Sequence, residues 1–264
     1  MDAQSELKRL LDIMARLRDP ARGCPWDREQ DSRTIAPYTI EEAYEVAEAA
    51  EAGDPAALKD ELGDLLFQTV FHARMAEEVG LFDFADVAGA VSDKMMRRHP
   101  HVFGDAAIDG AEAQTIAWEK QKASERRARG ADSVLDGVGV GLPALTRAEK
   151  LQKRAARVGF DWPDVAPVVA KIEEELAELR AEMGPVPDPA RLEDEIGDLL
   201  FAAVNLARHL RVDPEQALRG ASRKFERRFR QVEARMKESG LSLDTAGLPA
   251  LEAEWQRVKS AEPR

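Results

Sequence analysis

The chain has 264 residues with a net charge of −12, and 33% of its residues are charged while only 6% are aromatic. This length fits two domains of about 130 residues, each large enough to bury a core. The acidic balance argues against a broad footprint on duplex DNA, no apolar run reaches the ~20 residues that span a bilayer, and the single cysteine favours a reducing, cytoplasmic compartment.

Apolar residues recur at three- and four-residue spacing along the chain, which predicts helices. The first such stripe runs from Leu7 to Leu17 and ends at the breaker "RDPARGCPWD". "AGDPAA" then separates the second and third predicted helices, and "RRHPHVFGD" interrupts the first half near its end. No stretch alternates with a sustained period of two, so the fold is predicted to be all-α.

The segment "GADSVLDGVGVGLPAL" carries four glycines and one proline and is typical of a connection between domains. "GFDWPD" and "MGPVPDP" separate helices in the second half. The predicted organisation is therefore an N-terminal helical domain at 1–128, a linker at 129–145 and a C-terminal helical domain at 146–264.

One amphipathic stretch is present twice. "ELGDLLFQTVFHAR" begins at Glu61 and "EIGDLLFAAVNLAR" begins at Glu195, 134 positions later, with nine of fourteen residues identical. "EEAYE" precedes the first copy and "EELAE" the second, while "KMMRR" and "WEKQK" follow the first and "KFERR" and "WQRVK" the second. Four patterns in the same order indicate a tandem duplication of a domain.

The acids of this repeat have the spacing of a metal site. In a helix, Glu42 and Glu45 share one face, and so do Glu61 and Asp64. Antiparallel packing of the two helices would bring four carboxylates together, and a cation would relieve their repulsion. Oxygen ligands alone suit Mg²⁺, with Mn²⁺ as a substitute. A lone "EExxE" in so charged a helical protein is more often a solvated face, but the ordered recurrence favours the metal site.

The second half repeats the same acids, and each aspartate precedes an apolar "LLF", so the acids are expected at the edge of a buried stripe. The second-half set is Glu175, Glu178, Glu195 and Asp198. A di-iron site is not expected, because it needs Glu-x-x-His and none of the four histidines has a Glu three residues before it.

Basic and aromatic residues recur in step with the acids and could hold a phosphorylated ligand. A lysine and an arginine four apart could grip phosphate oxygens, and a tryptophan could stack on a base, although a tryptophan at helical spacing is more often core. The second-half set is Lys224, Arg228, Trp255 and Lys259, and the first-half set is Lys94, Arg98, Trp118 and Lys122.

The two halves differ at one informative position. Asn205 lies seven residues after Asp198, and its counterpart in the first half is Phe71. An asparagine can bond to a sugar or a base, or to a neighbouring helix, whereas phenylalanine can only pack. The difference favours the second half as the better-equipped site.

The motifs "EEAYE…ELGDLLFQTVFHA" and "EELAE…EIGDLLFAAVNLARHL", with "RRHPHVFGD", "SVLDG", "GLPAL" and "QKRAARVGFDW", resemble the MazG family of nucleoside triphosphate pyrophosphohydrolases. The resemblance runs from about Leu10 to Lys259. It implies an all-α homodimer that hydrolyses a nucleoside triphosphate to the monophosphate and pyrophosphate with Mg²⁺, mainly in the C-terminal half. It also implies that the acids are metal ligands and that Lys224, Arg228, Trp255 and Lys259 contact the nucleotide.

For this reaction, water would attack the α-phosphorus, with broad base specificity. Glu174 or Glu175 would take its proton, and Lys224 and Arg228 would neutralise the charge developing on pyrophosphate. Two alternatives stand beside this hypothesis: a helical nucleotide- or partner-binding protein with negligible catalysis, and a sister-family pyrophosphatase for dNTP or dUTP. Neither a nucleic acid nor a membrane is expected as a partner.

Overall fold

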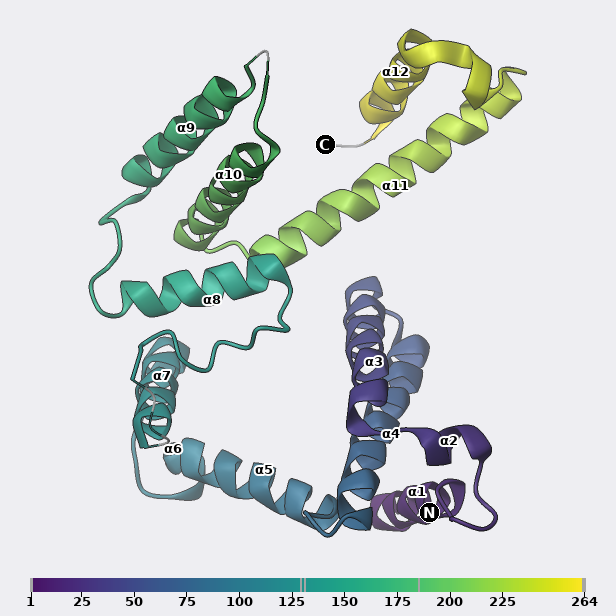
Figure 1. Cartoon of the computed structure of the whole chain (residues 1–264), viewed down its shortest axis with the longest axis vertical. Helices are drawn as coiled ribbons and strands as arrows, with labels where there is room; N and C mark the ends of the chain where they lie inside the picture. The colour runs from purple at the N-terminus through teal and green to yellow at the C-terminus, as the bar shows by residue number, and fades with distance from the viewer. Residues whose placement is uncertain (1, 129, 131, 185, 263–264) are drawn as a thin grey trace. The chain divides into compact units, whose positions relative to one another are not determined.

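The computed structural model describes residues 2–128, 130, 132–184 and 186–262, and every regular element in these ranges is a helix (Figure 1). The all-α prediction is therefore confirmed. The chain forms two compact units, Met1–Glu119 and Lys120–Arg264. Among the described residues, no helix is long and apolar enough to cross a membrane.

Unit 1 contains a pair of long helices that pack side by side, α3 and α4, with α1 against α4. A further helix, α7, begins in this unit and extends past its end. The helices are α1 (Ala3–Leu17), α2 (Pro25–Glu29), α3 (Ser32–Ala52), α4 (Pro55–Glu78), α5 (Phe84–Arg98), α6 (Pro100–Phe103) and α7 (Gly110–Ala128).

Unit 2 repeats this plan with the pair α9 and α10, against which α8 packs, and adds a second pair of long helices, α11 and α12. The helices are α8 (Ala144–Ala156), α9 (Val165–Glu182), α10 (Pro189–His209), α11 (Pro214–Glu238) and α12 (Leu243–Ala261). The described part of the predicted linker forms turns before α8. Residues 129 and 131 of that linker lie outside the described residues, as do residue 185 of "MGPVPDP" and the end residues 1, 263 and 264 of the predicted domains.

An Asp–Pro pair starts the second helix of each acidic hairpin. The side chain of Asp54 accepts hydrogen bonds from the backbone N–H groups of Ala56 and Ala57, and Pro55 occupies the first helical position. Asp188 and Pro189 start α10 in the same way. Proline fits there because its missing N–H would have no intrahelical partner, and the aspartate satisfies donors that the helix leaves free. The cap fixes where each acid-bearing helix begins.

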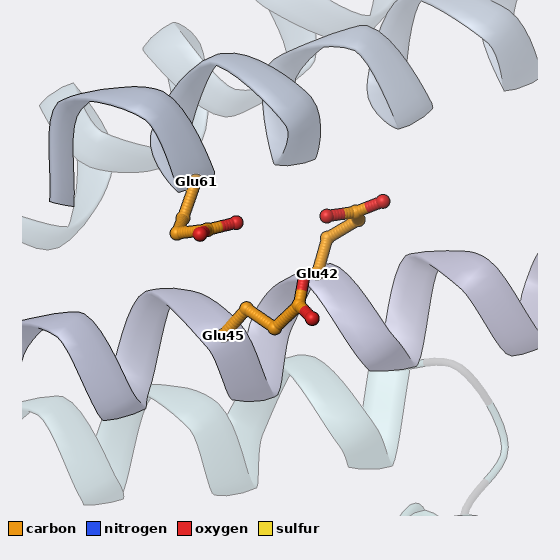
Figure 2. Close-up of side chains that lie close together, drawn as sticks. All are labelled: Glu42, Glu45 and Glu61. Carbon is orange, nitrogen blue, oxygen red and sulfur yellow. The ribbon is translucent and has the colours of Figure 1, made fainter. Parts of the chain in front are cut away.

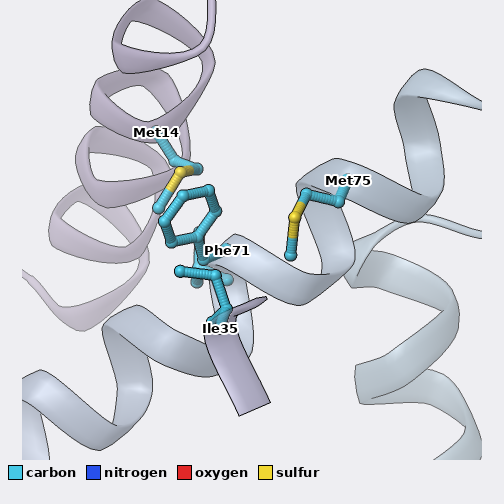
Figure 3. Close-up of a cluster of buried hydrophobic side chains, with 5 residues drawn as sticks. Met14, Ile35, Phe71 and Met75 are labelled. Carbon is cyan, nitrogen blue, oxygen red and sulfur yellow. The ribbon is translucent and has the colours of Figure 1, made fainter. Parts of the chain in front are cut away.

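The core of unit 1 lies where α1 and α3 meet the C-terminal part of α4. Met14, Ile35 and Phe71 are each at most 1% exposed and pack with Val70 and Met75 (Figure 3). Burying side chains of this size contributes about 1.5–3 kcal/mol each. The position of Phe71 is thus a packing position, as expected for a phenylalanine.

The apolar stripe beside the acids is only partly buried, which corrects the expectation of a buried stripe. Val70 and Val204 are buried, but Leu62 and Leu66 are 49% and 41% exposed. On α10, Leu200 is 53% exposed. Helical periodicity locates an apolar face without showing whether that face meets this chain's own core or another molecule. Each acidic hairpin therefore presents apolar surface around its carboxylates.

The pair α11 and α12 has a core of its own. Val232 and Met236 from α11 pack on Val258 from α12, and Trp255 borders this cluster. Within α12 the chain bends at Gly247, whose φ of +71° is a conformation that glycine adopts without steric cost. The bend lets one helical segment return along α11.

Candidate active site

Three carboxylates of unit 1 face one another across the α3–α4 pair. Glu42 and Glu45 project from one turn of α3, and Glu61 projects toward them from α4 (Figure 2). One carboxylate oxygen of each lies within 4.8 Å of the others. Desolvation raises the pKa of Glu42, and the negative charges of Asp64, Glu45 and Glu61 raise it further. Such mutual destabilisation of charged groups is what a bound cation relieves.

Unit 2 builds the equivalent cluster from Glu175 and Glu178 on α9 and Glu195 on α10. Desolvation raises the pKa of Glu195, followed by the charges of Glu178 and Glu175. Glu175 is only 4% exposed. Its Oε1 pairs with the Lys171 ammonium at 2.7 Å, while its Oε2 is buried with no hydrogen-bond partner. A buried carboxylate oxygen without a partner is costly to the apoprotein and is ready to bind a cation.

The fourth predicted ligand of each half lies beside the cluster rather than within it. Asp64 and Asp198 are exposed and fall outside the two groups of close carboxylates among the described residues. Their charges nevertheless raise the pKa of Glu42 and Glu195, respectively. The structure thus gathers three predicted ligands in each half and holds the fourth nearby.

The donor set fits a hard divalent cation. All the converging ligand atoms are carboxylate oxygens, and Mg²⁺ is a hard cation that takes oxygen ligands and keeps part of its water shell. The partner-free Oε2 of Glu175 is a further reason to expect an ion in unit 2. Glu175, Glu178 and Glu195 would hold it.

Lys171 was not found from the sequence, although it is part of this site. Its ammonium also pairs with Glu174 at 2.8 Å, and these two carboxylates raise its pKa well above the ordinary range. The signal was present, because Lys171 lies three and four residues before Glu174 and Glu175, a spacing that brings side chains together on a helix. Glu174 itself is mostly exposed, whereas Glu175 is buried.

A pocket of about 710 Å³ in unit 2 includes part of this cluster. Glu175, Asp198 and Lys171 line it, together with Asn205 and an apolar wall that contains Trp162. Pockets of this volume hold ligands of nucleotide size. The carboxylates of unit 2 are therefore joined to a cavity that could hold an organic substrate.

Polar residues that the sequence did not reveal also line this pocket. Gln152 on α8 is buried; its Nε2 donates to the Phe201 carbonyl oxygen at 2.8 Å, and its Oε1 has no partner. Arg208 contacts Asn205 on its own helix. It also contacts Asp161 of the "GFDW" motif, which lies 47 residues earlier in the chain. Helical spacing cannot predict contacts between residues so far apart in sequence.

The predicted phosphate- and base-binding residues belong to the α11–α12 pair. The Arg228 guanidinium pairs with Glu262 at 2.6 Å and lies 5.8 Å from the centre of the Trp255 ring. Lys224 and Lys259 are exposed. Among the described residues that line the pocket, none of these four is present. The pocket is therefore lined without the Lys224–Arg228–Trp255–Lys259 group, which lies on α11 and α12.

In the first half, the corresponding basic residues lie on α5 and α7. The indole Nε1 of Trp118 donates to the Arg98 carbonyl oxygen at 2.9 Å, and the His99 ring meets the Trp118 ring edge-on. Lys94 lies one turn before Arg98, and Lys122 one turn after Trp118. Trp118 is thus held to the end of α5 by a hydrogen bond to the backbone.

Comparison with known proteins accounts for the duplicated pattern. The model of the MazG nucleotide pyrophosphohydrolase domain matches residues 30–103 and again 165–233. The nucleoside triphosphate pyrophosphohydrolase of Escherichia coli K12 is 52% identical over 259 residues, which cover 98% of each chain. The nucleoside triphosphate pyrophosphohydrolase/pyrophosphatase MazG of Thermotoga maritima is 44% identical over 96% of this chain and 95% of its own. The chain therefore belongs to the MazG family, with the family's domain present twice.

Proposed function

We propose that this protein is a Mg²⁺-dependent nucleoside triphosphate pyrophosphohydrolase, which converts a nucleoside triphosphate and water to the monophosphate and pyrophosphate. The observation that carries the proposal is the buried, partner-free Glu175 carboxylate oxygen in the lining of a nucleotide-sized pocket. The names of the Escherichia coli and Thermotoga maritima relatives, which span almost the whole chain, support it.

Bound Mg²⁺ would supply Lewis acidity, polarising the phosphate and lowering the pKa of an attacking water. Glu175 would hold the ion with Glu178 and Glu195, with Asp198 beside them. Glu174 or Glu175 would take the proton of the water as it attacks the α-phosphorus. Lys171, already paired with both, would orient these carboxylates and offer its ammonium to a phosphate oxygen.

Lys224 and Arg228 would neutralise the charge that develops on the departing pyrophosphate, and Trp255 and Lys259 would contact the nucleotide. Since these residues do not line the pocket of their own chain, we propose that a homodimer supplies them from the second protomer. The exposed leucines beside the acids give such a dimer apolar surface to bury. The acidic net charge and the single cysteine fit a cytoplasmic enzyme without a nucleic-acid partner.

The test is to incubate the full chain with ATP, GTP, CTP and UTP and Mg²⁺ in ¹⁸O-labelled water, and to follow the products by phosphorus NMR. We expect pyrophosphate and a monophosphate that carries the label, since attack at the α-phosphorus puts the new oxygen there. Label in pyrophosphate, orthophosphate as the primary product, or equal rates without a divalent metal would reject the proposal. Binding of nucleotides without any product would favour the binding-protein alternative.

A panel of dNTPs, including dUTP, separates broad specificity from the sister-family activity. Stacking on an aromatic ring tolerates every base, so we expect rates within about tenfold of one another across the ribonucleotides. A preference for one deoxynucleotide well beyond that range would assign the protein to the narrower alternative.

A further inference from the structure

The amide of Asn205 is held in one orientation in the wall of the unit 2 pocket. Asn205 is 7% exposed, and its Oδ1 accepts a hydrogen bond from Arg208 Nε at 2.9 Å. A guanidinium can only donate, so the amide oxygen faces Arg208 and the amide nitrogen faces elsewhere. Among the described residues, none accepts a hydrogen bond from Nδ2, and this atom is not one of the buried polar atoms without a partner. A donor with solvent access is therefore left for a ligand.

Arg208 is fixed in turn by Asp161. Its Nη1 donates to Asp161 Oδ2 at 2.9 Å, and its Nη2 contacts Asp161 Oδ1. His209 Nε2 lies 3.0 Å from the same Oδ1. Arg208 lowers the pKa of Asp161 to about 2, so this carboxylate is ionised in the physiological range. A guanidinium that is bidentate to a carboxylate has a defined plane, which also fixes the direction of its Nε–H toward Asn205.

The position of Asn205 along α10 relates this donor to the carboxylates. Asn205 lies seven residues after Asp198, which is about 10 Å along a helix axis. Both line the same pocket, as do the aromatic rings of Phe160 and Trp162. A nucleotide whose phosphates lie at the carboxylates would therefore bring its nucleoside part to Asn205.

We propose that Asp161 and Arg208 are positioning residues, which lock Asn205 as a hydrogen-bond donor, so that the pocket selects nucleotides with an acceptor on their nucleoside part. The inference rests on the proposed function, which places the phosphates at the carboxylates. The acceptor is either a carbonyl oxygen or ring nitrogen of the base or a hydroxyl oxygen of the sugar, since both can accept from an amide N–H.

The first half provides a natural comparison, because the same helix positions hold different partners there. Phe71 stands at the position of Asn205 and is packed in the core. Arg74 stands at the position of Arg208 and pairs with Glu77 and Glu78 of its own helix. The first half thus lacks the donor, and its arginine serves a local ion-pair network. Arg74→Lys is therefore a matched control for Arg208→Lys.

The test measures binding of AMP, GMP, CMP and UMP to the full chain with Mg²⁺ by calorimetry. We expect Asn205→Ala and Arg208→Lys each to weaken the affinity about tenfold, as the loss of one good hydrogen bond does. The double variant should be no weaker than Asn205→Ala alone, because Arg208 acts through Asn205. Arg74→Lys should bind like the native protein.

Inorganic pyrophosphate with Mg²⁺ is the probe that separates positioning from a general structural effect, since it has no nucleoside part. Its affinity should be the same in all variants. If Arg208→Lys does not fold, Asp161→Asn, which keeps the shape and removes the charge, takes its place. Three outcomes would each overturn the inference. They are losses of affinity that add in the double variant, an unchanged affinity in Asn205→Ala, and no measurable monophosphate binding to the native protein.

Two further ligands identify the source of the acceptor. If the acceptor is on the base, ribose 5-phosphate should have the same affinity for Asn205→Ala as for the native protein. If the acceptor is a sugar hydroxyl, the 2′,3′-dideoxy monophosphates should have the same affinity for both proteins. Binding of a monophosphate needs no turnover. If the native protein releases no pyrophosphate while the single and double variants bind monophosphates as expected, the proposed catalysis is rejected and the positioning network stands.

Discussion

At the scale of single residues, the two carboxylate clusters differ in the group placed one turn before the first glutamate. Lys171 precedes Glu175 by four residues, and the corresponding residue before Glu42 is Tyr38. The lysine neutralises part of the second cluster and places a cation beside it, which the proposed function assigns to a phosphate oxygen. Tyr38 instead meets Trp26 edge-on. Both clusters can attract a cation, but the second is better equipped to hold a phosphate beside it.

The first prediction compares Glu175→Gln with Glu42→Gln. Because Glu175 is buried in the lining of the pocket, its replacement should lower kcat for pyrophosphate release by about two orders of magnitude, the size of effect expected for an electrostatic group at the reacting phosphate. Glu42→Gln should change the rate by less than about twofold. Steady-state assays that follow pyrophosphate release by the two variants measure these rates. Equal losses of rate would contradict the assignment of catalysis to the second half.

The second prediction concerns charge repulsion in the apoprotein. The pKa of Glu195 is raised above its ordinary value of 4.5 in the folded state. Below pH 4.5 the carboxyl is protonated in both the folded and the unfolded chain, and the folded state keeps its full stability. As the pH rises through the raised pKa, the carboxyl ionises and this stability is lost. Glu195→Gln should therefore raise the melting temperature at pH 7 without metal and leave it unchanged at pH 4. The same substitution should reduce the increase in Tm that Mg²⁺ produces, since a ligand that binds the native state stabilises it.

Glu193→Gln is the control for this prediction, because Glu193 is an exposed acid on the same helix outside the cluster. It removes one negative charge and should leave both the melting temperature and the response to Mg²⁺ nearly unchanged. If Glu193→Gln stabilises the protein as much as Glu195→Gln does, net charge rather than the cluster is responsible.

At the scale of elements, the acidic hairpins could be predicted because their signals are local. Apolar periodicity, Asp–Pro starts and acids three apart each act within a few residues, and the structure places Glu175 and Glu195 close together on paired helices. The Asp161–Arg208 pair could not be predicted, since it joins residues 47 apart. Nor could the exposure of Leu62 and Leu200, because the same pattern describes a core and an interface.

The third prediction tests the packing role of Phe71, which stands in the first hairpin where the second has Asn205. Phe71→Asn removes a ring that is 1% exposed in the unit 1 core and buries an amide there (Figure 3). The free energy of unfolding of unit 1 should fall by about 3–5 kcal/mol, as measured by urea denaturation. Phe71→Leu, which keeps an apolar side chain, should cost less. A loss below about 1 kcal/mol for Phe71→Asn would show that the core does not depend on this ring.

At the scale of the whole molecule, the pocket and the proposed nucleotide-contacting residues belong to different helices of the chain. Glu175 lies in the pocket wall, whereas Arg228 and Trp255 lie together on the α11–α12 pair and do not line that pocket. Exposed apolar side chains such as Leu200 lie on the acid-bearing helices. A two-fold homodimer would bury the apolar surface in a self-complementary interface, and it could also bring Arg228 of one protomer to the acids of the other.

The last prediction tests such shared sites by mixing two inactive variants. Glu175→Gln and Arg228→Ala should each be nearly inactive alone. When equal amounts are unfolded together and refolded, half of the dimers carry one of each chain, and one of their two sites then combines an intact Glu175 with an intact Arg228. The mixture should therefore recover about a quarter of the native activity, by the statistics of a two-fold dimer. A mixture as inactive as its components would mean that each site takes both residues from one chain, since a mixed dimer then contains no intact site.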